Sequence, residues 1–166
     1  RLAQEVALVL IGRALHATRH HLPRMDAMLH RVGVKRRPYR GGELRAWFQP
    51  IHDLTSNDVI GFEALCRWVT PSGIVPPNEF ITVAEDTGLI VEVGAVMLDQ
   101  ACEAIARARR ETGRDLFVSV NVSARQLVDD GIVCVVAETL ARHQLAGEAL
   151  CLEITESIMV NDQNVE

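Results

Sequence analysis

The sequence contains no long hydrophobic run. Its longest apolar stretches, Val6–Ile11 and Ile132–Ala137, are six residues each, whereas a membrane-spanning helix needs about 18 consecutive apolar residues. The 166 residues are 48% hydrophobic and 23% charged, a composition that excludes the disordered and collagen-like classes and favours an ordinary globular one. We therefore predict a soluble chain that holds one domain of ordinary size.

Cysteine pairs of the kind that bind zinc are also absent. The four cysteines lie 36, 32 and 17 positions apart, without a CxxC pair or a histidine at zinc-ligand spacing. Four secreted cysteines could form two disulfides, but no signal peptide precedes them, so this interpretation is the less favoured one. The sequence predicts reduced core thiols in a cytoplasmic protein, at Cys66, Cys102, Cys134 and Cys151.

Positive charge is scarce after residue 42, and the charge divides the chain into two units. Residues 1–42 carry a net charge of +7 and residues 43–166 a net charge of −12. We interpret residues 1–42 as the helical tail of an upstream module followed by a basic linker, since aromatic residues do not alternate with its charges as they do in many nucleic-acid sites. No duplex nucleic acid is expected as a partner. The chain starts at Arg1 without an initiator methionine, and we interpret it as a piece of a longer parent protein.

From residue 44 onward, strand patterns alternate with helix patterns. Two strand patterns separated by turn residues come first and predict an antiparallel pair. Strands separated by helices then predict parallel pairing, in a barrel or an open sheet. Ser123 and Gln126 form the pattern of a capping box at the start of a short helix. We expect strands at 44–51, 59–68, 116–121 and 150–155, and longer helices at 77–86, 91–112 and 131–143.

Oxygen-bearing side chains occupy one face of three of these strands. Because successive residues of a strand alternate between faces, Glu63 and Arg67 share a face, and Asn121 and Glu153 lie at similar places in the two later strands. Burying unpaired carboxylates is costly, and hard oxygen ligands suit Mg²⁺ or Mn²⁺ better than zinc. Two simpler interpretations stay open: Glu63 pairs with Arg67 on its own strand, and Asn121 hydrogen-bonds a loop.

Five motifs, in this order along residues 44–162, resemble the EAL domain of bacterial cyclic di-GMP phosphodiesterases. They are FQPI at 48–51, GFEALCRW at 61–68, AEDTGLI at 84–90, SVNVSARQL at 119–127 and LEITES at 152–157. The resemblance implies an α/β fold of the TIM type, a (β/α) barrel whose first strand is antiparallel to the others. Residues 43–166 would be the N-terminal half of that domain and would form a partial barrel, preceded by the helical linker.

The resemblance also implies an activity, the metal-dependent hydrolysis of cyclic di-GMP to pGpG, with Mg²⁺ or Mn²⁺ as cofactor. Carried over residue by residue, it makes Glu63, Asn121 and Glu153 metal ligands, with Glu63 essential for catalysis. It makes Gln49, Leu65 and Arg67 contacts to the nucleotide, and a guanidinium is a suitable bidentate partner for phosphate. Glu156 corresponds to a glutamate that steadies a loop over the site and would support the metal ligands from outside.

Some groups of the family's active site are missing from the sequence. In the family, a paired-aspartate motif, a lysine, a further glutamate and a glutamine follow this point, whereas the only lysine here is Lys35. A barrel of this type takes about 250 residues, so we expect these groups beyond Glu166 in the parent protein. An alternative is a catalytically inactive receptor for cyclic di-GMP or a protein-interaction module. Expected partners are cyclic di-GMP, an upstream sensor or diguanylate cyclase module, and a second copy in a homodimer.

Overall fold

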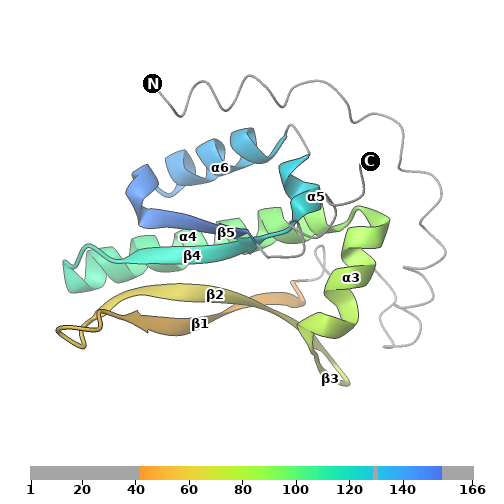
Figure 1. Ribbon diagram of the computed structural model, residues 1–166, viewed down its shortest axis with the longest axis horizontal. Helices are drawn as coiled ribbons and strands as arrows, with labels where there is room; N and C mark the ends of the chain where they lie inside the picture. The colour runs from red at the N-terminus through yellow and green to blue at the C-terminus, as the bar shows by residue number, and fades with distance from the viewer. Residues whose placement is uncertain (1–41, 129–130, 155–166) are drawn as a thin grey trace, which may run out of the picture.

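The computed structural model describes residues 42–128 and 131–154, and its sheet begins with a β-hairpin. Strand β1 (Leu44–His52) pairs antiparallel with strand β2 (Val59–Thr70) (Figure 1). The turn between them is held by Asp53, whose Oδ1 accepts hydrogen bonds from the backbone amides of Ser56 at 2.8 Å and Thr55 at 2.9 Å. The same two bonds lower the pKa of Asp53. The antiparallel first pair expected from the sequence is confirmed.

The other long strands run parallel to β2. Strand β4 (Phe117–Val122) pairs with β2, and strand β5 (Leu150–Ile154) pairs with β4. The order across the sheet is β1-β2-β4-β5, with the short strand β3 (Gly73–Val75) pairing antiparallel with β2. Strand β3 is absent from the sequence predictions because three residues are too few to show an alternating pattern. The mixed α/β class and the parallel crossovers are as expected.

Proline and glycine mark the ends of the helices. Helix α3 (Pro77–Thr87) begins at a proline and ends at Gly88, and helix α4 (Ile90–Thr112) ends at Gly113. Both glycines adopt left-handed conformations, with φ of 79° and 66°, which a residue without Cβ adopts readily. The remaining helices within the described residues are α5 (Ala124–Leu127), α6 (Gly131–Arg142) and the 3₁₀ turn η2 (Gly147–Ala149). The expected boundaries of α3, α4 and α6 agree with these to within one residue.

The hydrophobic core lies between one face of the sheet and helix α4. Leu98 and Ile105 of α4 are 1% and 2% exposed, and Val118 and Val120 on the facing side of β4 are 0% and 2% exposed. Helix α6 packs beside α4 on the same side of the sheet (Figure 1). Trp68 closes the end of this core, where its ring meets Phe80 edge-on with centroids 5.7 Å apart. Burial of one face leaves the opposite face of the strands for polar side chains.

The cysteines match the sequence prediction only in part. All four are free thiols in the structure. Cys102 is buried and Cys66 is partly buried, but Cys134 and Cys151 are exposed. The expectation of four core thiols is therefore wrong for these two, because Cys134 lies on a helix face turned away from the core and Cys151 on the sheet face opposite α4.

Two expectations from the sequence fall wholly or partly on residues that the structure does not describe. The helical tail and basic linker predicted for residues 1–42 lie almost entirely outside the described residues, and so does the end of the LEITES motif. Among the helices that the structure describes, none has the length and apolar character needed to cross a membrane.

Gly61 allows β2 and β4 to approach closely. A Cβ added there would lie 2.7 Å from the backbone oxygen of Phe117 and 2.8 Å from its ring. We expect Gly61→Ala to lower the free energy of unfolding by about 1–3 kcal/mol, the usual effect of overpacking. Chemical denaturation of the parent protein measures this. Gly147→Ala is the control because nothing lies within 4 Å of the added Cβ, and an equal loss in both variants would contradict the prediction.

Candidate functional site

A row of polar side chains crosses the sheet on the face opposite α4, which we call the open face. In the strand register, Gln49 of β1 lies opposite Glu63 of β2, and Asn121 of β4 lies opposite Glu153 of β5. Glu63 itself lies opposite Ser119, two residues before Asn121 on the same face of β4. The register thus brings together Gln49, Glu63, Asn121 and Glu153 from four neighbouring strands.

A direct hydrogen bond joins the two middle members of this row. Nδ2 of Asn121 donates to Oε1 of Glu63 at 2.9 Å. Among the described residues, no ion pair joins Glu63 to Arg67, and Asn121 bonds a strand residue and not a loop. Neither of the simpler interpretations left open by the sequence is therefore observed.

Arg67 lies on the open face, two residues beyond Leu65. Its Nη1 donates to the backbone oxygen of Cys66 at 2.8 Å, and its Cζ lies 5.5 Å from the ring centroid of Trp47. Burial raises the pKa of the Cys66 thiol to about 11, although the charge of Arg67 acts in the opposite direction. The thiol is therefore protonated at neutral pH and does not serve as a nucleophile there.

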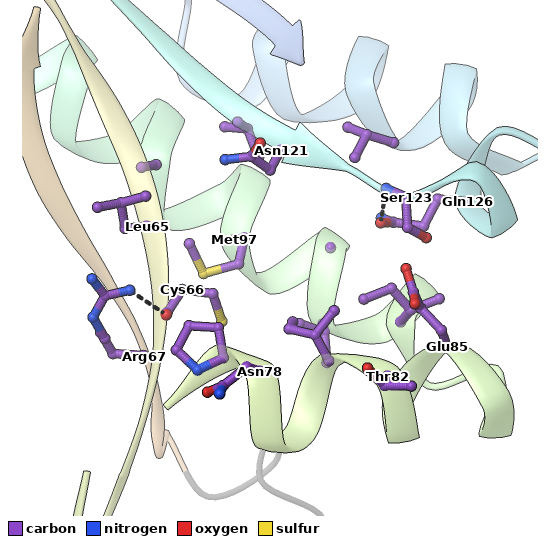
Figure 2. Close-up of a pocket in the computed structure, with 18 residues that line it drawn as sticks. Leu65, Cys66, Arg67, Asn78, Thr82, Glu85, Met97, Asn121, Ser123 and Gln126 are labelled. Carbon is purple, nitrogen blue, oxygen red and sulfur yellow. Dashed lines mark hydrogen bonds between the residues drawn. The ribbon is translucent and has the colours of Figure 1, made fainter. Parts of the chain in front are cut away.

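A cavity of about 410 Å³ opens beside Leu65 and Arg67 (Figure 2). Its volume falls within the range of about 300–1,000 Å³ typical of small-molecule sites. Leu65 and Arg67 lie at one end of it and Ser123 and Gln126 at the other, with helices α3 and α4 forming the walls. The residues that line the cavity include polar ones from several elements, namely Asn78, Thr82, Glu85, Asn121 and Ser123.

The chain after Asn121 forms one half of the expected capping box, the bond to the Gln126 side chain, whereas Oγ of Ser123 has no hydrogen-bond partner in the described part of the chain. The backbone amide of Ser123 donates to Oε1 of Gln126 at 3.0 Å, and Gln126 is 3% exposed. Nε2 of Gln126 lies 1.8 Å from the position that a Cβ on Gly94 would take, so only glycine at 94 admits this amide. The side chain of Gln126 thereby packs the turn after β4 against helix α4, close in sequence to Asn121.

The side chains of this row offer oxygen atoms as possible metal ligands. Glu63 and Glu153 supply carboxylates, and Asn121 keeps its Oδ1 as an acceptor because Nδ2 makes the bond to Glu63. Within residues 42–128 and 131–154, no three histidine, cysteine, aspartate or glutamate side chains gather as a ready metal site. Two carboxylates and one amide fit a hard divalent cation that takes its remaining ligands from elsewhere. Glu156 lies outside the described residues.

Sequence reasoning missed two parts of this site. Trp47 lies on the open face next to Arg67. Its position two residues before Gln49 could have predicted this face, because alternate residues of a strand share a face. The cavity wall contributed by Asn78 and Thr82 of α3 could not have been found in this way, because it depends on how the helix folds back over the end of β2.

Comparison with known proteins decides the family. The family model described as "EAL domain" matches residues 27–166. The chain belongs to the EAL domain family. The match begins within the segment that the sequence analysis assigns to the tail and linker, and the division at residue 42 stays a prediction.

Two curated relatives illustrate the similarity of this EAL chain. The signaling protein YkoW of Bacillus subtilis is 41% identical over 118 residues, which cover 70% of this chain and 15% of YkoW. The bifunctional diguanylate cyclase/cyclic di-GMP phosphodiesterase MucR of Pseudomonas aeruginosa is 35% identical over 149 residues, which cover 89% of this chain and 19% of MucR. The EAL chain therefore corresponds to a small part of each relative.

A solved structure gives the same result for the fold. The complex of the PaMucR phosphodiesterase with c-di-GMP superposes with a TM-score of 0.73 at 35% identity, covering 82% of this chain and 54% of that one. The EAL chain thus spans about half of the solved domain, and its α/β sheet with an antiparallel first strand is a partial barrel of the TIM type, as the sequence predicts.

Proposed function

We propose that the parent protein is a cyclic di-GMP phosphodiesterase and that this chain supplies the first half of its EAL domain. The observation that carries the proposal is the bond between Asn121 and Glu63, with Glu153 in register beside Asn121. These are the residues whose motifs correspond to the metal ligands of the family. The c-di-GMP complex of PaMucR, at 35% identity, supports the same substrate.

In this proposal, Glu63, Asn121 and Glu153 hold Mg²⁺ or Mn²⁺. When bound, such a cation lowers the pKa of a water molecule and stabilises charge on the phosphate during hydrolysis to pGpG. The amide of Asn121 donates to Oε1 of Glu63 and would hold the carboxylate in place as a ligand for the cation. Glu156 would steady a loop over the site.

The nucleotide would lie across the open face at the ends of β2 and β4. Arg67 offers two parallel N–H donors to a phosphate, Gln49 lies opposite Glu63, and Leu65 forms an apolar wall of the cavity.

A hydrolysis assay tests the proposal. The purified parent protein is incubated with cyclic di-GMP and either Mg²⁺ or Mn²⁺, and pGpG is quantified by chromatography. We expect pGpG in both cases and none after a chelator removes the metal. Binding of cyclic di-GMP without hydrolysis would favour the receptor, and the absence of binding would contradict a nucleotide function altogether.

Arg67→Ala tests the phosphate contact. We expect nucleotide affinity to fall by about 10- to 100-fold, the usual value of a charge-assisted hydrogen bond, while Mn²⁺ affinity stays within twofold. Calorimetric titration of the parent protein with each ligand measures both. Arg107→Ala is the control because Arg107 is an exposed arginine of α4 that pairs with Glu111. Equal loss of metal and nucleotide affinity would assign Arg67 a structural role.

One relative supports a proposed partner module. MucR combines a diguanylate cyclase with a phosphodiesterase, so we propose a cyclase or sensor module upstream of this chain. We further propose a cytoplasmic location, a homodimeric assembly, and no role for duplex nucleic acid.

A further inference from the structure

Trp47 is a half-exposed aromatic side chain on the open face. The residue is 49% exposed. In the β1–β2 register it lies opposite Leu65, which places Arg67 at the diagonal position. Diagonal neighbours on an antiparallel pair are within reach of aromatic and long side chains. The Cζ atom of Arg67 lies 5.5 Å from the ring centroid, inside the distance of about 6 Å at which a guanidinium is attracted to an aromatic face.

Few other contacts hold the Arg67 guanidinium. Nη1 donates to the backbone oxygen of Cys66 at 2.8 Å, and no carboxylate of the described residues forms an ion pair with it. The residue directly opposite Arg67 is Arg45, and like charges directly opposite on a sheet repel each other. The Trp47 ring therefore supplies the main side-chain attraction that keeps the guanidinium over the sheet.

We propose that Trp47 is a positioning residue that orients Arg67 toward the phosphate of the nucleotide, an inference that rests on the proposed function. A long arginine side chain loses rotamer freedom when it binds a ligand, and a partner that restricts it beforehand reduces this loss. The ring attracts the charge without consuming a carboxylate, so the full positive charge and the free N–H donors of Arg67 remain for the phosphate.

Trp47→Leu and Trp47→Phe in the parent protein test the proposal. Leucine keeps an apolar side chain but removes the aromatic face, and we expect the KM for cyclic di-GMP to rise about five- to tenfold with kcat within twofold. Phenylalanine keeps an aromatic face, and we expect a rise of no more than about twofold. Equal effects of the two variants on KM would overturn the proposal, because the effect would then not depend on the aromatic face.

A double-mutant cycle with Arg67→Ala separates positioning from direct contact. If Trp47 acts through Arg67, Trp47→Leu changes KM no further once Arg67 is alanine. If the effects of the two substitutions multiply, Trp47 contacts the nucleotide by itself and the positioning role is refuted. Phe48→Ala is the matched control, since Phe48 is the neighbouring exposed aromatic, 40% exposed, on the opposite sheet face, and we expect its KM to equal that of the wild type.

The outcomes also distinguish this inference from the function on which it rests. A rise in KM with Arg67→Ala but not with Trp47→Leu would refute only the positioning role of Trp47. The absence of hydrolysis in the wild type would remove the proposed function, and the cycle is then measured on Kd for cyclic di-GMP. Melting temperatures of all variants identify a loss of fold, and the Trp47→Phe variant keeps the comparison valid if Trp47→Leu is unstable.

Discussion

Glu63→Gln is expected to reduce the hydrolysis of cyclic di-GMP by the parent protein about a thousandfold or more. The substitution keeps the size of the side chain and an oxygen that can accept the bond from Asn121, but it removes the negative charge proposed to hold the cation. Loss of a single stabilising donor in an active site already costs about 10²–10³ in rate, and loss of a charged metal ligand is more severe. Chromatography of pGpG and calorimetry with Mn²⁺ measure rate and metal affinity in parallel.

Glu103→Gln is the matched control for this variant. Glu103 is an exposed glutamate of α4, so the same chemical change there is expected to leave both rate and metal affinity unaltered. Glu63→Ala is expected to be as inactive as Glu63→Gln. Turnover of Glu63→Gln near the wild-type rate would refute the assignment of Glu63 as a metal ligand.

The 166-residue chain alone is expected to hydrolyse no cyclic di-GMP, whereas a protein that continues through a complete EAL domain does so. The chain covers 54% of the solved PaMucR domain. In the described part of the chain, β5 pairs only with β4, so its other side is an unpaired row of backbone donors and acceptors. Side chains of the open face cannot be enclosed by half a barrel, and we also expect low stability or self-association of the chain alone.

Parallel assays with Mn²⁺ of the chain and of the extended protein measure this difference, and light scattering reports self-association. Comparable turnover in the two would show that the first half of the domain carries every essential catalytic group. A monomeric chain with a cooperative melting transition would contradict the expected instability, independently of the result for turnover.

The sequence predicted the four longer strands and the longer helices because each has a local signal. Alternation placed Glu63 on the open face, and the glycines after α3 and α4 marked the ends of those helices. The sequence predicted that Asn121 and Glu63 face one shared interior, but not that they form a hydrogen bond. The two residues are 58 positions apart, and the register between their strands depends on how α3 and α4 return the chain to the sheet. The exposure of Cys134 and Cys151 was missed because a locally apolar segment does not reveal which of its faces meets the core.

The antiparallel direction of β1 determines the end at which the chain enters the sheet. Leu44, the first residue of β1, lies opposite Trp68, and Arg45 lies opposite Arg67. The chain consequently enters the sheet at the end where β2 finishes, beside the proposed phosphate contact, whereas a parallel first strand would enter from the far end. The upstream module proposed above would therefore join the sheet within a few residues of the strand position opposite Arg67. In the proposed function, a change in that module would reach the nucleotide site without a long-range relay.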